Sequence, residues 1–111
     1  MYYYDREGKP LSEDEGMSLF SVNADDRRVA ETTVGDVYIS TVYLGIDHNW
    51  SNTGPPLIYE TMAFRTVDGG PDFGEELYCY RYATEEQAQI GHDFVVKCFL
   101  EGRDPYALLE P

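Results

Sequence analysis

The segment 47–50 holds the densest group of side chains that could bind a ligand or carry out chemistry. It places a carboxylate, an imidazole, an amide and an indole at successive positions: Asp47, His48, Asn49 and Trp50. A histidine together with carboxylates can hold a divalent cation or act as a general base. Glu60 and the second histidine, His92, would complete such a site if the fold brought them to this segment.

A structural interpretation explains the same segment more simply. Asp and Asn side chains often bond to the backbone of their own loop, so Asp47 and Asn49 would shape the loop while Trp50 pinned it to a sheet. No histidine pair has the spacing of a metal motif such as His-Glu-x-x-His. His92, beside an apolar helical stripe, is more typical of a hydrogen-bonded residue at the core boundary. We therefore predict no catalytic residue, no metal site and no cofactor.

Glu60 is unusual because it lies in the largely apolar run 57–64. A carboxylate in such a run must face solvent, find a partner or serve a function that needs a shifted pKa. We favour an ion pair with Arg81 across a sheet, which would explain both residues. The candidate contact residues for a ligand or partner are therefore Asp47, His48, Asn49, Trp50, Glu60, Arg81 and His92.

The elements that must position these residues begin with a series of strands. Runs rich in Val, Ile, Thr and Tyr predict strands at 2–4, 28–34, 37–46, 57–67 and 77–82. Glycines predict turns near 34–36 and over 68–72. The two-residue period of a strand puts Tyr78, Tyr80 and Tyr82 on one face of the sheet.

Two capping patterns predict helices. Ser12 and Thr84 are each followed three residues later by Glu or Gln, which is the pattern of a capping box. Gly16 weakens the first helix, for which we expect two or three turns, whereas the second carries an apolar stripe and ends at Gly102. We predict one α+β domain over residues 1–111. It is a small antiparallel β-sheet of four to five strands, with a short N-terminal helix and a C-terminal helix packed on one face.

The acidic composition limits the kinds of partner. Of 111 residues, 21 are acidic and 8 are Lys or Arg, so the net charge is −13, yet 42% are hydrophobic and can form a core. We exclude direct binding of nucleic acid or of an anionic membrane, because both need a basic patch. No apolar run is long enough for a transmembrane helix, and the first residues lack a secretion signal. We expect a cytoplasmic protein whose cysteines, Cys79 and Cys98, are reduced.

Several segments together resemble small hypothetical accessory proteins of actinobacterial phages. The segments that carry the resemblance are 2–10, 28–36, 40–50, 54–64 and 81–88, with Gly91 and His92. Gly16 and the additional residues 65–76 depart from the pattern. The resemblance implies a protein that acts in the cytoplasm of the host cell, and it carries over no catalytic residue.

From these observations we expect a non-catalytic phage accessory protein that binds a host protein, such as a component of a defence system. Its contact regions would be the polar loop 47–56 and the dispersed acidic surface, which could be simply solvated or could mimic phosphate spacing. One alternative is a small-ligand or metal-binding protein that captures or turns over a nucleotide-like signal. The cations for that role would come from Arg27, Arg28, Arg65 and Arg81. A second alternative is a minor virion component.

Overall fold

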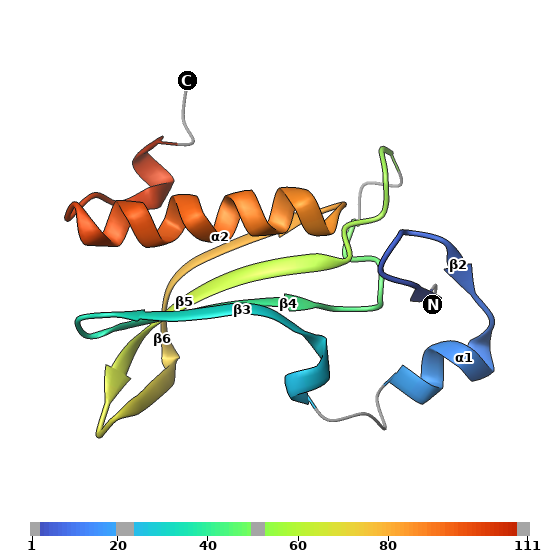
Figure 1. Cartoon of the computed structure of the whole chain (residues 1–111), viewed down its shortest axis with the longest axis horizontal. Helices are drawn as coiled ribbons and strands as arrows, with labels where there is room; N and C mark the ends of the chain where they lie inside the picture. Colours follow the sequence, from blue (N-terminus) through green and yellow to red (C-terminus); the bar gives the residue numbers. More distant parts are fainter. Residues whose placement is uncertain (1–2, 20–23, 50–52, 109–111) are drawn as a thin grey trace.

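The computed structural model describes residues 3–19, 24–49 and 53–108. Its centre is a four-stranded antiparallel sheet in the order β3-β4-β5-β6, crossed on one face by the C-terminal helix α2 (Figure 1). In chain order the elements, with η for a 3-10 helix, are β1 (Tyr3–Tyr4), β2 (Pro10–Leu11), α1 (Glu13–Ser18), η2 (Ala24–Arg27), β3 (Arg28–Val34), β4 (Val37–Tyr43), β5 (Tyr59–Val67), β6 (Gly70–Tyr82), α2 (Glu85–Leu100) and η3 (Pro105–Leu108). The predicted α+β class is confirmed. Among the described residues, no helix has the length and apolar character needed to cross a membrane.

The sheet has two unlike faces because its residues alternate along each strand. In β4 every second residue is buried and faces α2: Val37, Ile39, Thr41 and Tyr43. The helix meets them with its own buried residues: Ala88, His92, Val95 and Cys98. The core therefore lies between the sheet and α2, and no helix within residues 3–19, 24–49 and 53–108 covers the opposite face of the sheet (Figure 1).

The end of β4 and the start of β5 differ from the sequence prediction. β4 ends at Tyr43, before the predicted end, because the chain turns at Gly45, which adopts φ +78. The Gly45 carbonyl then accepts a hydrogen bond from the Tyr4 backbone N–H of the N-terminal hairpin. β5 begins at Tyr59, later than predicted.

The turn predicted over residues 68–72 is shorter in the structure. Asp68 and Gly69 have φ +51 and +82, a pattern that reverses a hairpin in two residues. β6 therefore begins at Gly70 and is longer than the predicted strand 77–82. Pro71 is tolerated in β6 because β6 is an edge strand. The register of β5 and β6 shifts near this turn, and the tip of the hairpin bends away from α2 (Figure 1).

α2 begins at the predicted cap, Thr84. The Thr84 hydroxyl accepts a hydrogen bond from the Gln87 N–H at 3.1 Å, but the Gln87 side chain accepts from the Ala83 N–H, so the capping box is not reciprocal. Gly91 allows the helix to approach the sheet closely, since a Cβ there would lie 2.1 Å from the Tyr82 hydroxyl. The tyrosines predicted to share one face of the sheet line a common groove with α2: Tyr78, Tyr80 and Tyr82.

α1 contains a glycine, and its packing shows why. The capping box at Ser12 is complete, because the Glu15 carboxylate also accepts from the Ser12 N–H. A Cβ at Gly16 would lie 2.0 Å from Cγ of Tyr3, so the glycine is required for contact with the N-terminal hairpin. α1 spans six residues and is shorter than the predicted two to three turns.

Candidate functional site

The loop after β4 is held together by its own side chains, as predicted for Asp47 and Asn49. The Asp47 carboxylate accepts hydrogen bonds from the Asn49 N–H at 2.7 Å and from the Leu57 N–H at 2.9 Å, which ties the start of the loop to its end. The Asn49 amide donates to the carbonyls of Thr53 and Pro55. These bonds give both residues a structural role. Trp50 lies outside the described residues, and loop 47–56 as a contact region stays a prediction.

His48 also serves the loop. Its Nδ1 lies 2.9 Å from the Ile46 carbonyl oxygen, so this ring nitrogen donates, and its backbone N–H donates to the Leu57 carbonyl. The side chain is half-buried. His48 is thereby fixed at the base of the loop on the β4 side.

His92 is a core residue and not the boundary residue that the sequence indicated. It is 2% exposed on the inner side of α2, and its Nε2 lies 2.9 Å from the Thr32 hydroxyl. Its Nδ1 lies 2.8 Å from the Thr41 hydroxyl, which in turn lies 2.5 Å from that of Thr61. Burial lowers the pKa of His92, so the neutral imidazole is favoured. One ring nitrogen donates and the other accepts, and both are satisfied by threonines that no sequence motif indicated.

The alternative joint site of His48, Glu60 and His92 does not form, because the sheet separates Glu60 from His92. Thr41 and Thr61 point toward His92 on the face covered by α2. Glu60 is directly opposite Val42 and therefore lies on the other face. Among the described residues, no group of three or more His, Cys, Asp or Glu side chains could hold a metal ion.

The predicted ion pair between Glu60 and Arg81 is present. The two residues are direct partners across β5 and β6, and Arg81 Nε donates to Glu60 Oε2 at 2.9 Å. The Glu60 side chain is only 12% exposed. The Cys79 thiol lies 3.6 Å from the same carboxylate oxygen. Burial and the negative charge of Glu60 together raise the pKa of Cys79 to about 11, so this thiol is protonated at neutral pH.

Most of the arginines are engaged with carboxylates. Five of them form ion pairs within the described residues: Arg6, Arg28, Arg65, Arg81 and Arg103. Each pairing offsets the positive charge that a phosphate group would need. A nucleotide-like ligand would have to compete with the protein's own acidic groups, which disfavours that alternative.

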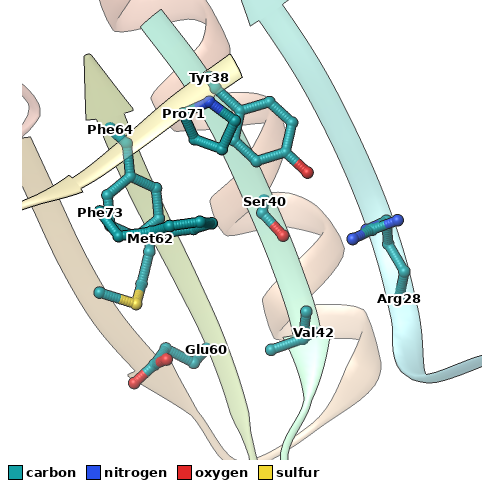
Figure 2. A pocket seen from close by; sticks show the side chains of 9 residues that line it. All are labelled: Arg28, Tyr38, Ser40, Val42, Glu60, Met62, Phe64, Pro71 and Phe73. Carbon is teal, nitrogen blue, oxygen red and sulfur yellow. The ribbon is translucent and has the colours of Figure 1, made fainter. Parts of the chain in front are cut away.

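A groove that sequence motifs did not indicate lies on the uncovered face of the sheet. It has a volume of about 510 Å³ and is lined by Arg28, Tyr38, Ser40, Val42, Glu60, Met62, Phe64, Pro71 and Phe73 (Figure 2). Phe73 comes from the bent β5–β6 tip and is 74% exposed, and its ring meets that of Phe64 at 5.1 Å, edge to face. The only sequence signal for the groove is the alternation that places Val42 and Met62 away from α2.

Charged groups surround this apolar floor. Arg28 binds Asp25 at 2.6 Å and also lies 3.5 Å from Glu31. The Tyr38 hydroxyl donates to the Glu31 carboxylate at 2.6 Å, and burial together with this bond raises the pKa of Tyr38. Together with Glu60, these carboxylates outnumber the arginines that they bind. The groove thus combines an apolar floor with an acidic border.

Comparison of the chain with protein families, with curated proteins and with solved structures finds no match.

Proposed function

We propose that the protein is a non-catalytic interaction protein that binds a protein partner on the sheet face opposite α2. The observation that carries the proposal is the groove of about 510 Å³ with its exposed Phe73. An apolar groove beside an exposed aromatic ring is typical of a surface that a partner covers. The described histidines are both engaged in structural hydrogen bonds, which favours binding over acid–base chemistry.

The charge of the groove border favours a partner with a basic contact surface. Asp25, Glu31 and Glu60 lie around the groove or on its wall, and the arginines beside them are already neutralised. The whole chain carries a net charge of −13, so its field attracts basic proteins and repels acidic ones. The resemblance to phage accessory proteins is our reason for seeking that partner in an infected host cell.

The decisive experiment compares capture of host proteins by variants on the two sides of the molecule. We expect Phe73→Asp to lose the partner, because it places a charge on the exposed aromatic of the groove. Ile90→Asp is the matched control: Ile90 is 63% exposed on α2, on the other side of the sheet, and this variant should retain the partner. Capture should weaken as salt concentration rises.

Two outcomes would overturn the proposal. One is capture that Ile90→Asp abolishes and Phe73→Asp leaves intact. The other is no stoichiometric partner from host lysate at any salt concentration. Circular dichroism of each variant distinguishes lost binding from lost folding.

A further inference from the structure

We propose that the partner presents an extended, basic segment that pairs with the outer edge of β3 as a fifth strand of the sheet. This inference rests on the proposed function, since it names the binding mode of the same partner. β3 is the first strand of the order β3-β4-β5-β6, so among the described residues one side of it has no neighbouring strand. An unpaired edge presents backbone N–H and C=O groups that an extended peptide can bind.

The backbone groups that point outward belong to Glu31 and Thr33. Val34 and Val37 are direct partners on either side of the two-residue turn between β3 and β4. The closing pair of such a hairpin exchanges both its hydrogen bonds, so the bonds to β4 come from Val34 and from every second residue before it. The intervening residues direct their N–H and C=O groups away from the sheet. No hydrogen bond from a described residue reaches these outward groups.

The opposite edge of the sheet is partly capped by the protein itself. On β6, the Cys79 N–H donates to the Tyr106 hydroxyl at 2.8 Å, and that hydroxyl donates to the Cys79 carbonyl at 3.3 Å. The Ala83 N–H, just beyond β6, donates to the Gln87 side chain. Tyr106 of η3 therefore caps the outward groups of Cys79 on the β6 edge, whereas no such cap from the described residues reaches Glu31 or Thr33 on the β3 edge.

The irregular part of β3 does not block this edge. A register shift between Arg28 and Ala30 disrupts the first residues of the strand, and such bulges often protect edges. From Ala30 to Val34 the pairing with β4 is regular. This stretch offers the outward groups of Glu31 and Thr33 to a short strand.

The charge beside the edge selects a basic segment over a second copy of this chain. Glu31 is paired with Ser40, so its carboxylate lies on the groove side of the sheet, next to the Tyr38 hydroxyl. An antiparallel copy centred on Glu31 would place two carboxylates opposite each other and would join two chains of charge −13. A Lys or Arg at that position would instead pair with Glu31. Residues opposite each other share a face, so the basic side chains of the segment should alternate with small apolar ones that lie beside Thr32 on the α2 side.

Peptides selected from a random display library against the immobilised full chain provide the probe. We expect the selected peptides to be basic and to alternate basic with small apolar residues. In amide hydrogen exchange followed by NMR, the Glu31 and Thr33 amides should exchange rapidly in the free protein. Each should be protected at least about tenfold in the complex, as expected for amides that enter new hydrogen bonds.

Two variant pairs test the edge directly. Thr33→Pro removes the outward N–H without removing a bond to β4, and Thr33→Val keeps that N–H, so affinity for the peptide should fall about tenfold or more only in the proline variant. Glu31→Lys should reject the basic peptide and accept its Lys→Glu counterpart, whereas Glu86→Lys, an exposed change on α2, should do neither. NMR spectra of each variant establish that it is folded.

Several results would overturn the inference: no peptide recovered, peptides without basic character, or equal binding by Thr33→Pro and Thr33→Val. Concentration-dependent dimerisation of the free chain that Thr33→Pro abolishes would instead assign the edge to a second copy. In each of these cases the Phe73→Asp capture experiment can still succeed, so failure of the strand-addition mode is distinguishable from failure of the proposed function.

Discussion

The two faces of the sheet differ in how their polar side chains are accommodated. On the α2 side, polar groups are taken into the core and satisfied there: His92 lies between Thr32 and Thr41 with a partner on each ring nitrogen. On the other side, Glu60 forms an ion pair with Arg81 near the surface. Buried polar groups must be bonded, whereas a half-exposed ion pair can rely partly on water.

The two faces differ in how far their interactions are completed within the chain. The covered face closes over hydrogen-bonded and apolar neighbours, and its residues are among the least exposed in the protein. The uncovered face leaves Phe73 largely exposed next to an apolar floor. We therefore expect stability to depend chiefly on the first face, and our proposal places the partner on the second.

The largest expected difference between the faces is in the cost of removing an apolar side chain. Ile39 is fully buried under α2, so Ile39→Ala should lower the free energy of unfolding by about 2–5 kcal/mol. Met62 is half-buried in the groove, so Met62→Ala should lower the free energy of unfolding by only about 1 kcal/mol, because solvent can fill the space left behind. Urea unfolding followed by circular dichroism measures both values. If the two variants lost equal free energy of unfolding, the two faces would not differ in their contribution to stability.

A smaller difference should be seen in the dependence of stability on pH. Burial holds the pKa of His92 in the folded state below its ordinary value of 6.5, so the unfolded chain binds the proton more readily. The contribution of His92 to the free energy of unfolding is complete above pH 6.5. It should fall as the pH drops from there toward the lower pKa of the folded state. His92→Gln keeps a donor and an acceptor but cannot titrate, and it should lose this part of the pH dependence.

Unfolding free energies of both proteins at several pH values between 7.5 and 5 provide the measurement. Carboxylates titrate in both proteins, so the difference between the two curves isolates the histidine. Parallel curves across this range would show that His92 does not titrate differently on folding.

The sequence predicted what depends on local pattern. Neighbours in the chain determine the strand alternation and the helix caps at Ser12 and Thr84. Pairing of adjacent strands determines the cross-strand partner of Glu60. The glycines show where local reasoning fails. By propensity Gly16 weakens a helix, but in the fold it makes room for Tyr3, a contact that only the tertiary structure reveals.

The candidate site was harder to predict for the same reason. His48, Glu60 and His92 are of the right types for chemistry, but their grouping requires knowledge of which face each one occupies. A one-residue difference in strand position sends a side chain to the other side of the sheet, which is why Glu60 and Thr61 belong to different faces. The groove was missed because Val42, Met62 and Phe73 carry no motif and become a surface only when the β5–β6 tip bends over the sheet.

The smallest expected effect concerns the thiol on the uncovered face. Glu60→Gln removes the charge that helps to raise the pKa of Cys79 and leaves Arg81 nearby, so the pKa should move down from about 11. Burial still favours the neutral thiol, so the pKa should stay above the ordinary value for cysteine. The stability cost should be small, below about 1 kcal/mol, because the Arg81 side chain left behind is 37% exposed and can be solvated. The rate of iodoacetamide alkylation as a function of pH reports the pKa, and Cys98, 3% exposed under α2, serves as the internal reference. An unchanged pH profile would mean that Glu60 does not act on this thiol, and the uncovered face would then lack the electrostatic coupling that distinguishes it from the covered one.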